Sequence, residues 1–583
     1  MKTITKKVTT ATLSLLLALT AFAGCGPNGG DESSAPITDS AVKDAKVCNI
    51  QVLKAGYGVD WLYDLKAKFE KAYEAEGYKL NILIPSSDMR GTLPMQLMAQ
   101  GYETTGTDLY ITADFWAPDV GKFSEYGQIA SDLKANVYDK PAIRYDGTEE
   151  AKTVSEKLDD GIEEYSKDVD GTYYSFPWVN SASGLVVNTK KLAKYGLSLP
   201  KTTNEMFDCF DKIYLGHNGI ENSEESKTFP ITYVAGANGY TMCFIDTLLA
   251  QYDFEDYTKF YSMQEANGTL MTENGYEVYN LPGVIEMLDV MYRTFDVNIS
   301  SYGSTTQQLD QAQAAIMKSN GYNAVFMFNG DWMLNEVKLN YKNNLHDIAF
   351  INNPVISALG TKLFGTGTSY NFNDAKCEEL LSYIIGLVDE NKSIDEMIAS
   401  VASVKGVTVA EKDVQEIARA RGVYFNRGIE HQAYIAEDAK AKDVAELVLR
   451  MMASDDFAQT FAQYSNGTTP YTTLSNTYTE YEFVEQASKL PINRYQTAIS
   501  SHKPASHKLT LRSKLGVGQF STTSHIVSTI STNSDLPSMY DGEGGRHSTN
   551  SASVYRQSAQ SFLTSEISNL QKNWNTWLKN AGF

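Results

Sequence analysis

Aromatic side chains stand beside polar ones just after two predicted strands, and this combination could bind a polar ligand. Tyr57 follows the strand predicted over 47–53, and Asp114 and Trp116 follow the strand predicted over 108–112. An aromatic ring offers a flat apolar face, and tyrosine adds a hydroxyl group. A carboxylate beside such a ring can accept hydrogen bonds from the ligand. We therefore expect noncovalent recognition, and not bond cleavage, at these positions.

Motifs for covalent or metal-assisted catalysis do not occur in the sequence. It has no Gly-x-Ser-x-Gly, no His-Glu-x-x-His and no Walker loop. The histidines are scattered and no Cys-x-x-Cys pair occurs, so we expect no metal site and no cofactor. A glycosidase needs two carboxylates that flank a sugar bond. Among 71 acidic residues such a pair is possible but unsupported, so a surface glycosidase stays an alternative to a protein without enzymatic activity.

The N-terminus has the features of a secretory lipoprotein signal. Lys2, Lys6 and Lys7 precede an apolar run over 11–23. This run is shorter than the about 20 residues that a membrane-spanning helix needs. Small residues precede Cys25, so we expect removal of residues 1–24 and lipidation of that cysteine. Two acyl chains anchor a protein stably, which places this one on the extracytoplasmic face of the cell membrane.

Composition predicts an acidic, multidomain body on a flexible tether. Residues 25–45 hold the lipidated cysteine and a stretch rich in Gly, Ser, Pro and Asp without apolar periodicity. Loss of the signal removes three lysines and no acidic residue, so the net charge of −21 becomes −24. Such a surface repels nucleic acid and anionic headgroups. A chain of 583 residues with 42% hydrophobic content is long enough for two or more domains.

Strands and helices alternate at the start of the folded part. Strands are predicted over 47–53, 79–84 and 108–112, with helices between them. In the first helix, Trp61, Leu65 and the residues that follow place large apolar side chains at four-residue spacing. This alternation predicts a mostly parallel sheet covered by helices. Ligands of such sheets bind beyond the carboxyl ends of the strands.

In the stretch 170–200, Gly171, Tyr174 and Pro177 precede a predicted strand, and a predicted helix after it ends at Gly196. This arrangement resembles the inter-lobe crossover of extracellular solute-binding proteins of ABC importers, in the carbohydrate-binding family typified by maltose-binding protein. That family pattern has a Gly, a Tyr and a Pro before a strand, then Asn and Lys, a helix that ends in Gly, and a Pro-x-Thr motif. The matching residues are Gly171, Tyr174, Pro177, Val187-Asn188-Thr189-Lys190, Gly196, Pro200-Lys201-Thr202 and Glu205. Thr203 departs from the pattern, because the family usually has Trp there.

A second resemblance to the same family lies over 315–336. A helix and the strand Ala324–Phe328 lead to Asn329-Gly330-Asp331-Trp332, as in the family's Asn-Gly-x-Trp motif. Asn-Gly favours the sharp turn that joins a strand to a helix. The resemblance implies that Trp332 faces the ligand cleft. Packing of Trp332 in the core of its own lobe is the alternative.

The resemblance implies an α/β fold of two lobes, like that of periplasmic binding proteins, which close on a ligand by a hinge motion. It covers about 47–354 and 426–475. We expect the first lobe over 46–181 and 426–465, and the second over 182–354 and most of 466–583. Residues 355–425 look like a helical insertion, and insertions of this length tend to form a subdomain at a lobe's edge.

The resemblance also implies a function. A monomeric binding protein would capture a sugar, most simply an oligosaccharide, and deliver it to ABC permease subunits. A peptide or a polyamine is the alternative solute. Sugars stack their C–H faces on aromatic rings while their hydroxyl groups bond to polar side chains. The candidate ligand-binding residues are Tyr57, Asp114, Trp116, Trp178, Asn180, Ser181, Asn329, Asp331, Trp332 and His431.

Four cysteines remain after Cys25, and their state is open in the sequence. They are Cys48, Cys209, Cys243 and Cys377. They could form two disulfides in any of three pairings, or they could be buried thiols.

Overall fold

The computed structural model describes residues 41, 44–54, 56–85, 93–113, 128–159, 162–167, 171–220, 226–234, 238–295, 308–318, 321–338, 340–341, 344–426, 430–465, 467–471, 497–499, 511 and 551–583. The predicted signal, Cys25, Asp114 and Trp116 lie outside these residues. None of the helices within the described ranges is long and apolar enough to cross a membrane.

The first lobe is built on a five-stranded sheet in the order β2-β1-β3-β12-β6. Its strands are β1 (Val47–Val52), β2 (Lys79–Leu83), β3 (Leu109–Ile111), β6 (Phe176–Pro177) and β12 (Gln432–Ile435). The central strand β1 runs parallel to β2 and β3, as the alternating pattern predicted. The strand β12 returns from much later in the chain and pairs antiparallel with β3 and β6. A separate hairpin joins β4 (Pro141–Ile143) to β5 (Glu149–Thr153).

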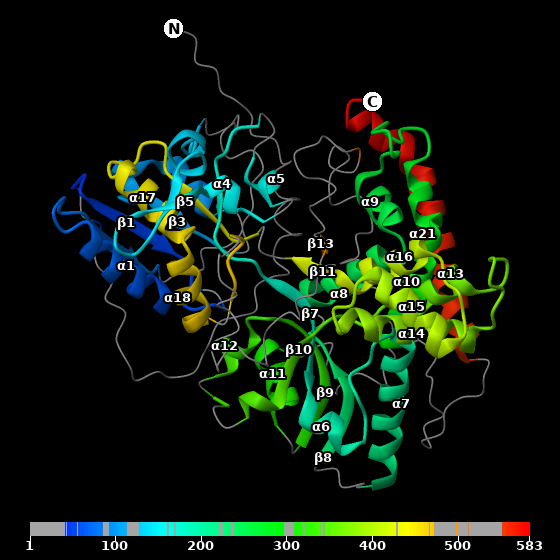
Figure 1. Ribbon diagram of the computed structural model, residues 1–583. Coiled ribbons are helices and arrows are strands. Elements are labelled where there is room, and N and C mark those ends of the chain that lie inside the picture. Colours follow the sequence, from blue (N-terminus) through cyan, green and yellow to red (C-terminus); the bar gives the residue numbers. More distant parts are fainter. Residues whose placement is uncertain are drawn as a thin grey trace.

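Helices cover this sheet because each has one apolar face. In α1 (Asp60–Ala72), Trp61, Leu65 and Phe69 recur every four residues and are fully buried. The helices α17 and α18 pack on the same core, and α18 lies beside α1 in Figure 1. The helices of this lobe are α1, α2 (Leu93–Gln100), α3 (Tyr102–Thr105), η2 (Lys134–Tyr138), α4 (Val154–Lys157), α5 (Glu163–Ser166), α17 (Lys442–Met452) and α18 (Asp455–Ser465).

The second lobe is built on a six-stranded sheet whose central strand, β7, carries three antiparallel partners. The order is β13-β11-β7-β9-β8, and β10 also pairs with β7. The outer strand β8 runs parallel to β9. The strands are β7 (Ala182–Asn188), β8 (Ser226–Thr232), β9 (Gly321–Gly330), β10 (Ile348–Ile351), β11 (Val423–Asn426) and β13 (Thr497–Ile499).

Long helices surround the second sheet. The C-terminal helix α21 packs along α10, and Trp574 is buried there with its indole N–H donating to the Thr272 carbonyl at 2.7 Å. The helices are α6 (Thr189–Lys194), α7 (Thr203–Ile220), α8 (Asn238–Tyr252), α9 (Phe254–Ser262), η3 (Gly275–Asn280), α10 (Pro282–Thr294), α11 (Leu309–Met317), α12 (Met333–Val337), η4 (Leu345–Asp347) and α21 (Ser551–Asn580).

Four further helices fill the stretch between β10 and β11. They are α13 (Ala358–Phe364), α14 (Asp374–Asp389), α15 (Ile394–Lys405) and α16 (Glu411–Gly422). Their apolar residues belong to the same hydrophobic cluster as those of α8 and α10. The Arg419 guanidinium donates to the carbonyls of Ala250 and Gln251 at the end of α8, at 2.7 and 3.1 Å. These helices therefore share the core of the second lobe, whereas we expected a subdomain at its edge.

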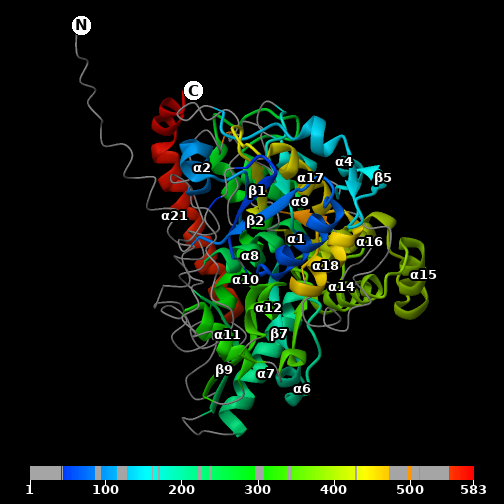
Figure 2. The same cartoon turned by 90° about the vertical axis from the view of Figure 1, so that its left-hand side faces the viewer.

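The two sheets lie in two bodies that the chain links more than once. In Figure 1 the first lobe lies at the upper left, and β7 leads from it down into the second lobe; Figure 2 shows the two from the side. The linking segment 178–181 joins β6 to β7, and the chain returns between β11 and β12. The Asn426 side-chain amide donates to the Asn180 side-chain oxygen at 2.7 Å, which ties the two links together. The fold is therefore the two-lobe α/β fold that we predicted. The exact lobe boundaries remain our proposal.

The four described cysteines are buried, and no disulfide links them. Burial raises the pKa of the Cys48 and Cys377 thiols, and that of Cys209 to about 11. A thiol with a raised pKa is a weak nucleophile. Of the two states left open by the sequence, the structure has the buried thiols.

Candidate interlobe binding site

Five of the candidate residues meet where the two lobes touch. Tyr57 lies in the turn between β1 and α1, and His431 directly precedes β12. Trp178 lies on the linking segment, while Asp331 and Trp332 form the turn between β9 and α12. We call these five side chains the interlobe cluster. They follow or precede strands of both sheets, so the fold brings together residues that lie up to 374 positions apart in the sequence.

Tyr57 is at the centre of the interlobe cluster. Its ring lies 6.4 Å from that of Trp178, 6.2 Å from that of Trp332 and 5.9 Å from that of His431, measured between centroids. All three pairs meet edge to face, an arrangement that aromatic rings favour. Phe461 of α18 adds a fourth ring at 5.6 Å. Tyr57 is consequently only 2% exposed.

A hydrogen bond between the lobes joins Tyr57 to Asp331. The Tyr57 hydroxyl donates to Asp331 Oδ1 at 2.8 Å, and the Ala182 amide donates to Oδ2 at 3.2 Å. Burial raises the pKa of the Asp331 carboxyl from its ordinary 3.8 to about 7, although these hydrogen bonds act in the opposite direction. Burial, and then the negative charge of Asp331, raise the pKa of the Tyr57 hydroxyl well above its usual range. The carboxylate is thus held in a site that strongly favours hydrogen-bond donors.

Trp332 fills the space between the two lobes. A Cβ atom on Gly56 would lie 2.6 Å from Trp332 Cδ1, and one on Gly330 would lie 2.1 Å from Cζ3, so neither position has room for a side chain. Trp332 follows a strand of the second lobe but packs with the apolar core of the first, and is 6% exposed. It therefore joins the lobes in this closed arrangement. We had expected a partly exposed residue that faces a cleft.

Trp178 belongs mainly to the first lobe. Its ring stacks on that of Trp61 at 5.3 Å, and its indole N–H donates to the Thr112 carbonyl at 2.9 Å. The His431 ring meets it at 5.5 Å. These contacts fix the Trp178 ring in the core, so only its edge faces Tyr57.

The other candidates on described residues, Asn180, Ser181 and Asn329, lie next to residues of the interlobe cluster or its linking segment. Asn180 is half-buried, and its amide donates to the Thr468 carbonyl at 2.7 Å. Ser181 is fully buried next to Ala182. The Asn329 side-chain oxygen accepts the Gly330 amide at 2.7 Å, which shapes the turn before Asp331. Neither hydrogen bond exposes a side chain of the interlobe cluster to a ligand.

Two residues that the sequence did not single out complete the contact between the lobes. Asn335 of α12 donates through its side-chain amide to the Gly56 carbonyl. The Tyr240 ring of α8 lies 5.8 Å from that of Trp332. Asn335 follows Asp331 by four residues, so helical spacing could have found it. Tyr240 has no comparable signal, because only tertiary packing brings it there.

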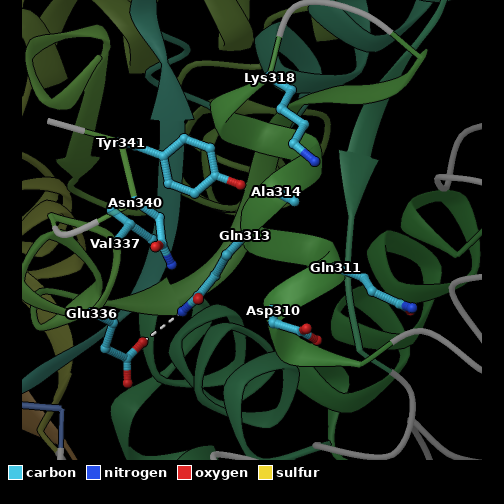
Figure 3. A pocket seen from close by; sticks show the side chains of 9 residues that line it. All are labelled: Asp310, Gln311, Gln313, Ala314, Lys318, Glu336, Val337, Asn340 and Tyr341. Carbon is cyan, nitrogen blue, oxygen red and sulfur yellow. Dashed lines mark hydrogen bonds between the residues drawn. The ribbon is translucent and has the colours of Figure 1, made fainter. Parts of the chain in front are cut away.

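A separate pocket of about 310 Å³ lies between α11 and α12 in the second lobe (Figure 3). The residues that line it are Asp310, Gln311, Gln313, Ala314, Lys318, Glu336, Val337, Asn340 and Tyr341. The Gln313 side-chain amide donates to Glu336 Oε2 at 2.6 Å across it. Glu336 also approaches the first lobe, since a Cβ on Gly56 would lie 3.0 Å from its Oε1. The pocket is polar and could hold a small hydrophilic molecule.

No group of three or more potential metal ligands comes together in the described part of the chain.

Comparisons with known proteins agree with this topology. Residues 55–281 match the family model described as bacterial extracellular solute-binding protein. No curated protein matches the chain.

Three solved structures to which this chain is similar share little sequence with it. The GacH receptor of Streptomyces glaucescens, solved unliganded and with acarbose, has 12% identity and a TM-score of 0.49, with 89% of this chain and 98% of that chain covered. The maltose-bound MalE3 of T. maritima has 13% identity and a TM-score of 0.47, with 88% and 99% covered. A chitin oligosaccharide binding protein has 13% identity and a TM-score of 0.48, with 90% and 99% covered.

The family match covers the segment that runs from the turn of Tyr57 to the start of α10. It includes the crossover at 170–200 on which the sequence resemblance rested. The match and the two-sheet topology together confirm that this chain resembles the bacterial extracellular solute-binding proteins.

Proposed function

We propose that this protein is the solute-binding component of an ABC importer, and that it captures a carbohydrate between its lobes and delivers it to the permease. The observation that carries the proposal is the interlobe cluster. It combines a buried carboxylate, Asp331, with the rings of Tyr57 and Trp332 at the contact between two lobes. Closure of two lobes around a solute is the usual motion of such proteins.

The chemistry of the interlobe cluster suits a neutral polyhydroxylated solute. Sugar hydroxyl groups can donate to Asp331 as the Tyr57 hydroxyl does, and the C–H faces of a sugar can lie on the rings. A hydrogen bond to a charged acceptor contributes about 1.5–3 kcal/mol. A polyamine would need several carboxylates, and at the interlobe cluster Asp331 and the neighbouring Glu336 supply two. Polyamines and peptides are therefore the less favoured solutes, and a glycosidase the least.

A thermal-shift screen tests this proposal. The panel consists of mono-, di- and oligosaccharides, amino acids, short peptides and polyamines. A carbohydrate at 100 times its Kd should raise the free energy of unfolding by about 2.7 kcal/mol. Stabilisation by polyamines or peptides alone would contradict the carbohydrate assignment. Release of shorter sugars from a bound oligosaccharide would show that the protein is a hydrolase.

The membrane anchor is a separate proposal that depends on Cys25. Its thiol would carry the lipid, and the acidic stretch after it would tether the two lobes outside the cell. Cys25→Ala should release the protein from membranes into the soluble fraction, because no second anchor is proposed. A variant that still sediments with membranes in high salt would contradict the lipoprotein assignment.

A further inference from the structure

Direct hydrogen bonds join the two lobes. The Tyr57 hydroxyl of the first lobe donates to Asp331 of the second, and Asn335 of the second donates to the Gly56 carbonyl of the first. At the edge of the contact, Lys338 Nζ donates to the Tyr464 carbonyl at 3.3 Å. Trp332 fills the space beneath Gly56. The closed form therefore has its own stabilising contacts.

Two of the hydrogen-bond donors to the Asp331 carboxyl, the Tyr57 hydroxyl and the Ala182 amide, belong to different lobes. The Ala182 amide belongs to β7, in the same lobe as Asp331, and the Asp331 amide donates back to the Ala182 carbonyl at 3.0 Å. This pair stays together whatever the position of the other lobe. The Tyr57 hydroxyl lies on the first lobe and leaves with it. Opening would thus remove from Asp331 Oδ1 the donor that belongs to the other lobe, the Tyr57 hydroxyl.

We propose that the Tyr57 hydroxyl occupies the position of a ligand hydroxyl on Asp331, so that the ligand must displace Tyr57 in order to bind. This inference rests on the proposed function. It names the chemistry of that subsite: a neutral hydroxyl donor, because a second anion beside a buried carboxylate would be costly. It also assigns the Tyr57 hydroxyl a role opposite to that of a ligand contact, since this hydroxyl competes with the solute while the ring stays part of the proposed site.

Such competition reduces the apparent affinity. If only a fraction of the empty protein is open, the apparent Kd equals the intrinsic Kd divided by that fraction. A variant without the Tyr57 hydroxyl should be open more of the time. It should therefore bind the ligand more tightly, although it has lost a polar group from the binding region.

Tyr57→Phe tests the inference, because it removes the hydroxyl and retains the ring that packs on Trp178 and Trp332. Spin labels on Glu74→Cys in the first lobe and Lys194→Cys in the second report the distance between the lobes. Both sites are exposed, while the four described native cysteines are buried. The parent protein without the two new cysteines is the labelling control. Tyr63→Phe, an exposed position on α1, is the matched control variant.

Without ligand, Tyr57→Phe should shift the distance distribution toward longer values, and Tyr63→Phe should not. For the carbohydrate identified in the screen, Tyr57→Phe should bind about 3- to 30-fold more tightly. An unchanged distance distribution in Tyr57→Phe would overturn the inference, as would affinity weakened tenfold or more, which would make Tyr57 a ligand contact. If no carbohydrate binds any variant, the proposed function fails, and the distance measurement still decides whether Tyr57 holds the lobes together.

Discussion

The interlobe cluster and the pocket between α11 and α12 both gather polar groups beside an aromatic ring, but they differ in burial. In the interlobe cluster, Tyr57 and Asp331 are 2% and 6% exposed and bond to each other across two lobes. In the pocket, Asp310 and Lys318 are exposed, and every lining residue comes from the second lobe. The pocket encloses about 310 Å³ of space, whereas the side chains of the interlobe cluster pack against one another.

This difference shows that the open pocket and the buried carboxylate lie at different positions in the protein. An exposed carboxylate such as Asp310 costs the fold little, so its position carries little information. A buried carboxylate is expensive unless hydrogen bonds compensate it. Asp331 is such a carboxylate, and one of its compensating donors, the Tyr57 hydroxyl, belongs to the other lobe. We therefore assign solute binding to the interlobe cluster, and the following predictions test that assignment.

The largest effect should come from Trp332→Ala. Removal of a buried Trp side chain costs about 3–5 kcal/mol of stability. Trp332 lies between the lobes and is only 6% exposed. We expect a loss of this size in the free energy of unfolding from urea titrations. Trp577→Ala, at a half-buried position on α21, is the control and should lose less. A loss below about 1 kcal/mol for Trp332→Ala would show that this contact between the lobes does not stabilise the protein.

The next effect concerns pH and Asp331→Asn. The Asp331 pKa is about 7 in the folded protein and 3.8 ordinarily, so the folded state binds the proton more readily than the unfolded state. Its contribution to stability is fully present below pH 3.8 and is lost as the pH rises through 7. Between these two pH values the free energy of unfolding changes by at most about 1.4 kcal/mol per pH unit.

Asparagine does not titrate, so Asp331→Asn should flatten the dependence of unfolding free energy on pH between 5 and 8. Its amide can donate to the Tyr57 hydroxyl and accept from Ala182, which preserves the geometry. Other titratable groups near this position are His431, Glu336 and Tyr424, and they are present in both proteins, so the difference between the two proteins isolates Asp331. An identical pH dependence in both proteins would mean that Asp331 does not have the raised pKa.

The smallest effect is expected in the pocket. Gln313→Ala removes the hydrogen bond to Glu336, which should cost about 1 kcal/mol or less because the groups are only partly buried. The unfolding free energy from urea titration measures this cost. A loss above about 2 kcal/mol would show that the polar groups of the pocket stabilise the fold substantially, which we do not expect of partly buried groups.

The sequence predicted those parts of the molecule that depend on local pattern. Four-residue spacing in α1 located its buried face, and the turn motif at Asn329-Gly330 placed Asp331 and Trp332 between a strand and a helix. The resemblance at 170–200 predicted two lobes. Each of these signals lies within a short window, and local conformation follows from it.

Burial and long-range partners were not predictable in this way. That Tyr57 bonds to Asp331, 274 residues away, follows only from the docking of the two lobes. The helices between β10 and β11 looked like an insertion because the sequence resemblance lapses there. Their amphipathic faces nevertheless complete the core of the second lobe. The tight approach of Trp332 to Gly56 likewise depends on tertiary packing and has no local signal.

The affinity of the carbohydrate from the screen for three proteins, measured side by side by isothermal titration calorimetry, tests the assignment of the site most directly. The proteins are the wild type, Asp331→Asn in the interlobe cluster and Asp310→Asn in the pocket. Each variant replaces one carboxylate by an amide of the same shape. We predict binding at least tenfold weaker for Asp331→Asn, from loss of a charged acceptor, and a change of less than about twofold for Asp310→Asn. Unchanged affinity for Asp331→Asn together with lost affinity for Asp310→Asn would contradict the account and place the solute in the pocket.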